Sequence, residues 1–150
     1  MHHIAILLPL IVSIGATILT IFCHALVAMT VVHFIIFERQ SGRAGTGFWT
    51  DTAIIATVVM MALTAHLVEI AIWAELFVML GEFQDFAIAF YHSAVNYTTL
   101  GYGDIVMSSQ WKLMAPIEAA DGVLMFGVSA AQVFAIIQRL VRTRFRELAA

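Results

Sequence analysis

The sequence predicts an all-α membrane protein with three transmembrane helices and a short fourth helix that enters the membrane and returns to its starting side. Hydrophobic residues make up 62% of the 150 residues and charged residues only 11%, which is more apolar surface than a soluble domain of this size can bury. The charges gather around long apolar runs, as they do at the ends of membrane spans. A formal charge of −3 argues against nucleic acid as a partner.

The first apolar run covers residues 4–37 and predicts a transmembrane helix. At about 1.5 Å per residue this helix is longer than the hydrocarbon core of roughly 30 Å, so it must tilt or protrude. Charged residues and three glycines follow within 38–51 and predict a polar loop. Residues 1–51 therefore form an N-terminal span together with its loop.

A second apolar run predicts a helix over 52–80, and a third predicts a helix over 113–138. Between them, Asp85 is suited to be the N-cap of a short helix over 85–97. This short helix is only about 20 Å long and cannot cross the membrane. The third span is followed by a basic tail over 139–150.

The short helix leads directly into the segment Thr98-Thr99-Leu100-Gly101-Tyr102-Gly103-Asp104. Its two glycines break the helix, and its backbone would lack hydrogen-bond partners if it faced lipid. The segment must therefore line a water-filled or ion-filled cavity. Residues 52–138 then form one domain in which 85–104 dips into the membrane and returns.

The arginines test this topology, because the cytoplasmic flanks of spans carry an excess of Lys and Arg. All six arginines lie in the loop 38–51 or after Gln138. A re-entrant segment puts both places on one side of the membrane, whereas a fourth full span would separate them. We therefore expect a multi-pass protein of the cell membrane with its N-terminus outside and its C-terminus in the cytoplasm. Glu82, Asp85 and Asp104 then lie at the outer mouth, which suits a cation.

The segment 98–104 has the composition of a selectivity filter. A potassium ion must shed its water to pass a narrow pore, and a row of backbone carbonyls can replace the hydration shell. To aim successive carbonyls at one axis, the chain must alternate between ordinary and left-handed conformations, which Gly101 and Gly103 permit. Here the sequence resembles the potassium channel superfamily and its TVGYG signature, over about residues 55–140. It looks closest to small bacterial channels with one pore loop per chain, extended by an N-terminal transmembrane helix.

This resemblance implies a potassium-selective channel built as a homotetramer, because one chain supplies a quarter of the filter. Four residues would bind dehydrated potassium through their carbonyls, the first of them also through its hydroxyl: Thr99, Leu100, Gly101 and Tyr102. Three neighbours would support the filter: Thr98, Gly103 and Asp104. Leucine stands at position 100 where valine is commoner, a change that leaves the carbonyl in place.

The short helix behind the filter departs from the family pattern. Val95 stands where a pH-gated bacterial channel has a glutamate that pairs with the aspartate after the filter, so Asp104 needs another partner or solvent. The family surrounds the filter tyrosine with an aromatic cuff, and Tyr91 and His92 occupy matching positions. Either of them could hydrogen-bond the Tyr102 hydroxyl.

The helix predicted over 113–138 carries Gly122 and Gly127. In the family, glycine here often marks a bend that opens the pore, but small residues also allow close helix packing, and both interpretations stay open. Helical spacing makes four residues a candidate lining of the cavity or gate: Val123, Phe126, Ala130 and Phe134.

Ionisable residues inside spans are costly and mark candidate sites. His66 and Glu69 lie one turn apart, and counting from the shared loop puts His24 at about the same depth. Such a buried cluster could be a structural clamp, a proton sensor or a metal site. Glu118 and Asp121, one turn apart, could brace the short helix from behind, or Asp121 could add negative potential near the cavity.

The sequence thus predicts passive potassium conduction without catalysis, and no cofactor besides the permeant ion. The first two spans carry no arginine ladder typical of a voltage sensor, so gating is expected to be leak-like or set by pH, lipid or membrane tension. The basic tail is expected to contact membrane lipids, anionic ones in particular. The alternatives are a non-selective cation channel and a non-conducting scaffold or accessory subunit.

Overall fold

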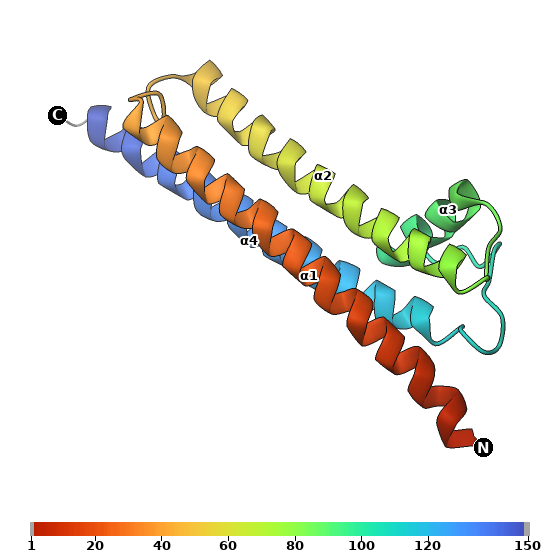
Figure 1. The fold of residues 1–150 in the computed structure, drawn as a ribbon. Helices are drawn as coiled ribbons and strands as arrows, with labels where there is room; N and C mark the ends of the chain where they lie inside the picture. The colour runs from red at the N-terminus through yellow and green to blue at the C-terminus, as the bar shows by residue number, and fades with distance from the viewer. Residues whose placement is uncertain (1, 149–150) are drawn as a thin grey trace. The chain divides into compact units, whose positions relative to one another are not determined.

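The computed structural model describes the backbone of residues 2–148 and the side chains of residues 6–145. Within this range the chain forms no strand and four helices (Figure 1): α1 (His2–Gln40), α2 (Phe48–Met79), α3 (Phe86–Tyr97) and α4 (Met114–Leu148). Three of them are long and apolar enough to cross a membrane, over Ile6–Gln40, Phe48–Met79 and Met114–Phe145. The predicted all-α class with three membrane spans is confirmed.

Three helix ends differ from the sequence prediction by three residues or more. The first is the start of α2, at Phe48 rather than at residue 52, inside the stretch predicted as a loop. The helix predicted to end at residue 37 continues to Gln40, because Glu38, Arg39 and Gln40 are good helix formers. Gly42, with φ of 66°, follows the end of this helix in a conformation that glycine adopts without strain. The helix predicted to end at residue 138 continues to Leu148, because no glycine or proline interrupts 128–148.

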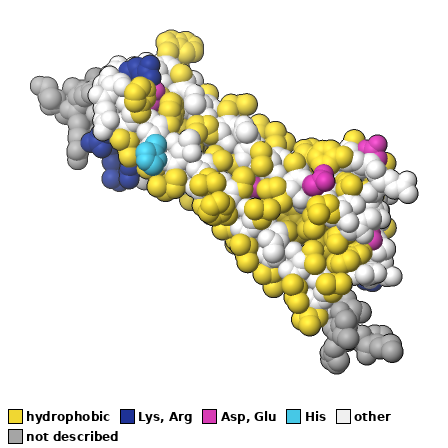
Figure 2. All heavy atoms as spheres, in the orientation of Figure 1, with side chains coloured by type: hydrophobic (Ala, Val, Ile, Leu, Met, Phe, Trp, Pro, Cys, Tyr) yellow, Lys and Arg dark blue, Asp and Glu magenta, His cyan; other side chains and the backbone are white. Residues whose placement is uncertain are grey.

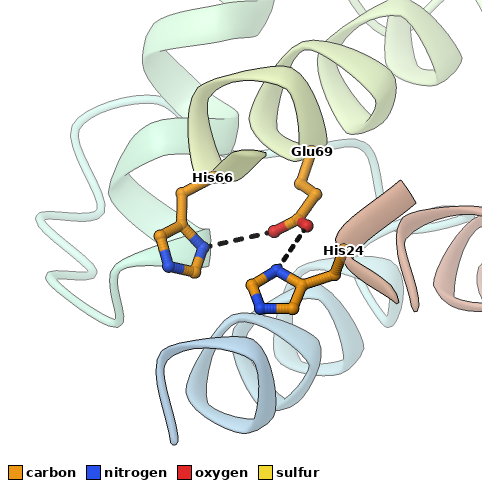
Figure 3. Close-up of side chains that lie close together, drawn as sticks. All are labelled: His24, His66 and Glu69. Carbon is orange, nitrogen blue, oxygen red and sulfur yellow. Dashed lines mark hydrogen bonds and ion pairs between the residues drawn. The ribbon is translucent and has the colours of Figure 1, made fainter. Parts of the chain in front are cut away.

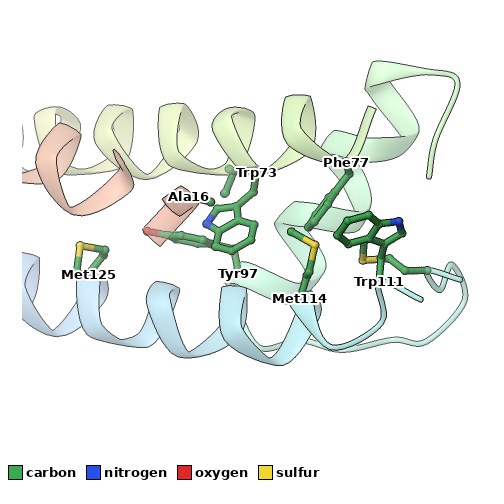
Figure 4. Close-up of a cluster of buried hydrophobic side chains, with 9 residues drawn as sticks. Ala16, Trp73, Phe77, Tyr97, Trp111, Met114 and Met125 are labelled. Carbon is green, nitrogen blue, oxygen red and sulfur yellow. The ribbon is translucent and has the colours of Figure 1, made fainter. Parts of the chain in front are cut away.

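Contacts divide the chain into two compact units. Unit 1 comprises Met1–His24 and His66–Phe126, so it contains α3 and the segment 98–104. Its core is aromatic and sulfur-rich, and its four largest fully buried side chains are Trp73, Phe77, Tyr97 and Met114. Figure 4 shows these side chains packed together with Trp111 and Met125.

Unit 2 comprises Ala25–Ala65 and Gly127–Ala150. Its core is purely aliphatic, with Val31 from α1, Ile54 and Val58 from α2, and Ile136 and Leu140 from α4. The loop between α1 and α2 is fixed by two acids. Glu38 forms a two-pronged ion pair with Arg43, and Asp51 accepts the Gly45 backbone N–H at 2.8 Å.

Hydrophobic side chains cover most of the visible surface of both units (Figure 2). On α1 alone, Ile11, Ile18 and Phe22 are each more than half exposed, and many further large apolar side chains share this exposure. A soluble monomer rarely presents contiguous apolar patches on this scale. The surface is that of a protein solvated by lipid.

Candidate functional site

The segment that follows α3 has an alternating backbone. The chain leaves α3 through a turn in which the N–H groups of Leu100 and Gly101 both donate to the Val95 carbonyl, at 2.9 and 3.1 Å. Every second residue then has a positive φ: 60° at Thr99, 60° at Gly101 and 71° at Gly103. Thr99 is the only described non-glycine residue with this property. The alternation that the sequence required of a carbonyl-lined filter is therefore present in one chain, with threonine adopting a conformation that few non-glycine residues take.

The end of this segment is held by α3. The Tyr91 hydroxyl donates to Asp104 at 2.8 Å, so Asp104 has the partner that Val95 does not offer. This hydrogen bond, more than burial, raises the pKa of Tyr91 above its usual value. A second α3 residue, His92, places Nδ1 3.0 Å from the Ile105 carbonyl oxygen.

His92 is buried, and its burial lowers the pKa of its imidazole. Its other ring nitrogen lies 2.9 Å from the Asn96 amide. The Tyr102 side chain is 65% exposed in a single chain. A bond from Tyr91 or His92 to the Tyr102 hydroxyl, in this chain or an adjacent one, stays a prediction.

The connection back to α4 has an anchor that sequence reasoning missed. Glu82 accepts both the backbone N–H and the hydroxyl of Ser108, each at 2.7 Å. From the sequence, Glu82 was expected at the outer mouth as a charge only. Its carboxylate in fact fixes the loop that returns from residue 104 to Met114.

The first buried carboxylate behind α3 is Glu69 (Figure 3). His24 Nδ1 lies 2.8 Å from one of its oxygens and His66 Nδ1 lies 3.2 Å from the other. The Tyr97 hydroxyl at the end of α3 donates to the same carboxylate. The structure thus brings together the three residues grouped from the sequence, and adds Tyr97, which was not foreseen.

This cluster has the composition of a metal site, since the ligand atoms of His24, His66 and Glu69 lie within 4.8 Å of one another and all three residues are buried. However, the same Nδ1 atoms already hydrogen-bond the carboxylate oxygens. A metal ion would have to replace these bonds. The geometry as it stands is that of a clamp joining α1, α2 and α3.

The other two carboxylates buried in unit 1 come from α4. Glu118 hydrogen-bonds the Ser93 hydroxyl on α3, and this hydroxyl lies 2.9 Å from the Ile70 carbonyl oxygen on α2. Asp121 accepts the Thr20 hydroxyl at 2.7 Å and the Trp73 indole N–H at 3.0 Å. Glu118 therefore braces α3, as one of the predictions had it. Asp121 instead connects α4 to α1 and α2.

Gly122 and Gly127 have different surroundings. A Cβ atom at position 122 would lie 2.0 Å from the Tyr97 carbonyl oxygen and 2.9 Å from its carbon, so α4 approaches the end of α3 as only glycine allows. A Cβ atom at position 127 would meet nothing within 4 Å. Close packing therefore explains Gly122, and a hinge at Gly127 stays a prediction.

The residues proposed to line a cavity or gate are all exposed in a single chain. Val123 and Phe126 belong to unit 1, where the Phe126 ring stacks on His66 at 4.3 Å between centroids. Ala130 and Phe134 belong to unit 2. Exposure is what a shared cavity requires of them, and their role in conduction stays a prediction.

Comparison with known proteins gives one match. A family model described as an ion channel matches residues 65–139, which include the end of α2, all of α3, the segment 98–104 and most of α4. No curated protein and no solved structure matches the sequence. The matched region is half of the chain and contains each of the three carboxylates behind α3. The chain belongs to the ion channel family and is a multi-pass membrane protein.

Proposed function

We propose that this chain forms a potassium-selective channel as a homotetramer, with Thr99, Leu100, Gly101 and Tyr102 lining the filter. One observation carries the proposal: positive φ at Thr99, Gly101 and Gly103, in a segment lying between a short helix and a membrane span. Four such segments around one axis would offer rings of carbonyl oxygens in place of the ion's hydration shell. The Thr99 hydroxyl adds an oxygen at the inner end.

Two further features favour a cation at this place. α3 ends at Tyr97, so the negative end of its dipole lies at the start of the segment. The outer mouth carries Glu82, Asp85 and Asp104, with Lys112 as the one base among them. A positively charged ion is stabilised from both ends of the filter.

The arginine distribution favours an N-terminus outside and a C-terminus in the cytoplasm of the cell membrane. Conduction is passive, down the electrochemical gradient, and needs no cofactor beyond the permeant ion. We infer that the channel is leak-like or responds to pH, lipid or tension. Of the three roles considered for the cluster of His24, His66 and Glu69, a structural clamp is favoured over a proton sensor or a metal site, because its hydrogen bonds join three helices.

Flux and reversal potentials of the full chain in liposomes test this proposal. We expect potassium to permeate far better than sodium, and native mass spectrometry to give a tetramer. Near-equal permeabilities would replace the selective channel with a non-selective one. Absence of flux from folded tetramers would favour a scaffold or accessory subunit.

A matched pair of glycine variants locates the filter. Gly101→Ala should abolish selective flux, because alanine is strained at a φ of 60°. Gly81→Ala imposes the same kind of strain at a φ of 75°, in the turn before α3. We expect it to lower stability by about 1 kcal/mol and to keep potassium selectivity. Equal loss of selectivity in both variants would contradict the filter assignment.

A further inference from the structure

A charged pocket lies in unit 2 between the ends of α1 and α4. It has a volume of about 280 Å³, and its polar lining consists chiefly of three arginines: Arg39 from α1, and Arg139 and Arg142 from α4. Figure 2 shows basic side chains, all of them arginines, near the end of the chain that Figure 1 marks as the C-terminus. Three arginines from two helices therefore line one pocket.

No acid neutralises these charges within the described part of unit 2. Its two described carboxylates are engaged elsewhere, since Glu38 pairs with Arg43 and Asp51 accepts the Gly45 N–H. Neither acid lines the pocket. Three arginines that line one pocket, with no acid among its described residues, favour an anionic ligand, and arginine matches phosphate geometry with paired hydrogen bonds.

An apolar groove continues from this pocket along the two helices. A second hollow of about 180 Å³ shares Ile35, Ile36, Ile136 and Arg139 with the first. It is also lined by Val32 and Gln132. Each lies about one helical turn before the shared isoleucines of its helix, so the groove runs away from the arginines along α1 and α4. Together the two hollows form an arginine-lined pocket with an adjoining, largely apolar groove.

We propose that this site binds one anionic phospholipid, with the headgroup phosphate on Arg39, Arg139 and Arg142 and an acyl chain along Ile35, Ile36 and Ile136. The location supports a lipid over a soluble anion, because the arginines stand near the ends of two candidate spans and apolar side chains of the same spans line the groove. Placement in the cytoplasmic leaflet rests on the proposed topology. Binding itself does not depend on potassium selectivity.

The pocket differs from a basic tail that attracts any anionic lipid non-specifically. The sequence predicted lipid contact for residues 139–150 as a whole. Arg39 lies a hundred residues earlier and completes the pocket, whereas Arg144 belongs to the tail but does not line it. A specific site predicts unequal effects from these arginines.

Lipid binding to the purified full chain, measured by native mass spectrometry with phosphatidylglycerol and phosphatidylcholine of equal chain length, tests the proposal. We expect a preference for phosphatidylglycerol. Arg39→Gln, Arg139→Gln and Arg142→Gln should each weaken it about fivefold and the triple variant on the order of a hundredfold. Arg144→Gln removes the same charge outside the pocket and should change affinity less than twofold.

A second pair of variants tests the acyl groove without changing charge. Ile36→Trp fills the groove and should reduce phosphatidylglycerol binding several-fold, whereas Ile137→Trp, at an exposed position outside both hollows, should leave it unchanged. Circular dichroism and elution volume establish that each variant is folded.

Three results would overturn the proposal: equal weakening by Arg144→Gln, displacement of the lipid by millimolar inorganic phosphate, or unchanged binding in the triple variant. Because flux is not measured, these results are independent of the test of conduction.

Discussion

The two units bury different chemistry. Unit 1 buries Glu69, Glu118 and Asp121 around its core, each with hydrogen-bonding partners on other helices. Unit 2 has an aliphatic core, and its two buried acids, Glu38 at the end of α1 and Asp51 at the start of α2, bond to the loop between these helices. Aliphatic cores tolerate exchange among side chains of similar size, but a buried carboxylate is stabilised only when its partners stand at defined positions. Unit 1 is thus built to fix the position of α3, and unit 2 to hold helices together.

The largest expected loss of stability comes from removing a buried carboxylate of unit 1. Glu69→Ala removes the partner of His24, His66 and Tyr97 at a fully buried position. We expect a loss of about 4 kcal/mol in the free energy of unfolding, as for other disrupted buried pairs. Ile136→Val in the core of unit 2 should cost only about 1 kcal/mol. Denaturation in detergent measures both, and equal losses would contradict the contrast.

The next effect concerns packing on α4. Gly122→Ala places a methyl group against the Tyr97 carbonyl and should destabilise the protein by about 3 kcal/mol, near the upper end for overpacking. Gly127→Ala enters open space and should stabilise the helix by about 0.5 to 1 kcal/mol through its intrinsic propensity. Thermal unfolding of the two variants is the measurement. Destabilisation of similar size at both positions would mean that α4 does not approach α3 closely.

The smallest effect is a pH dependence of unit 1. Burial lowers the pKa of His92, so the unfolded chain binds this proton more readily than the folded chain. The free energy of unfolding should therefore fall as pH drops through the ordinary histidine pKa of about 6.5 toward the lower folded value. Melting temperatures at pH 7.5 and 5 should differ less for His92→Asn than for the wild type.

A matched control for this pH dependence is His33→Asn, at an exposed site in unit 2. It should keep the full acid sensitivity of the wild type. If the two variants respond alike, a group other than His92 controls the effect.

Local signals predicted most of this fold. Apolar runs predicted the spans, Asp85 marked the start of α3, and Gly101 and Gly103 marked two of the positive φ values, because each signal depends only on neighbouring residues. His24 could be grouped with Glu69 because counting residues inward from the loop between two antiparallel helices puts both at the same depth.

Long-range partners could not be predicted in this way. Thr20 and Trp73 meet at Asp121 because of the orientation of α1, α2 and α4 about their own axes. A single sequence does not determine this orientation. The positive φ at Thr99 likewise follows from the turn at the end of α3, since threonine by itself disfavours it.

The region matched by the ion channel family begins at residue 65 and leaves α1 outside. Yet α1 supplies Thr20 to Asp121 and His24 to Glu69, one helical turn apart. A version of this protein reduced to two spans would keep His66 and Tyr97 on Glu69 and Trp73 on Asp121, but each acid would lose its α1 partner and its cover from hydrocarbon, where an ionised group is expensive. The additional span and the two acids are consequently interdependent, and a two-span architecture would call for apolar residues at positions 69 and 121.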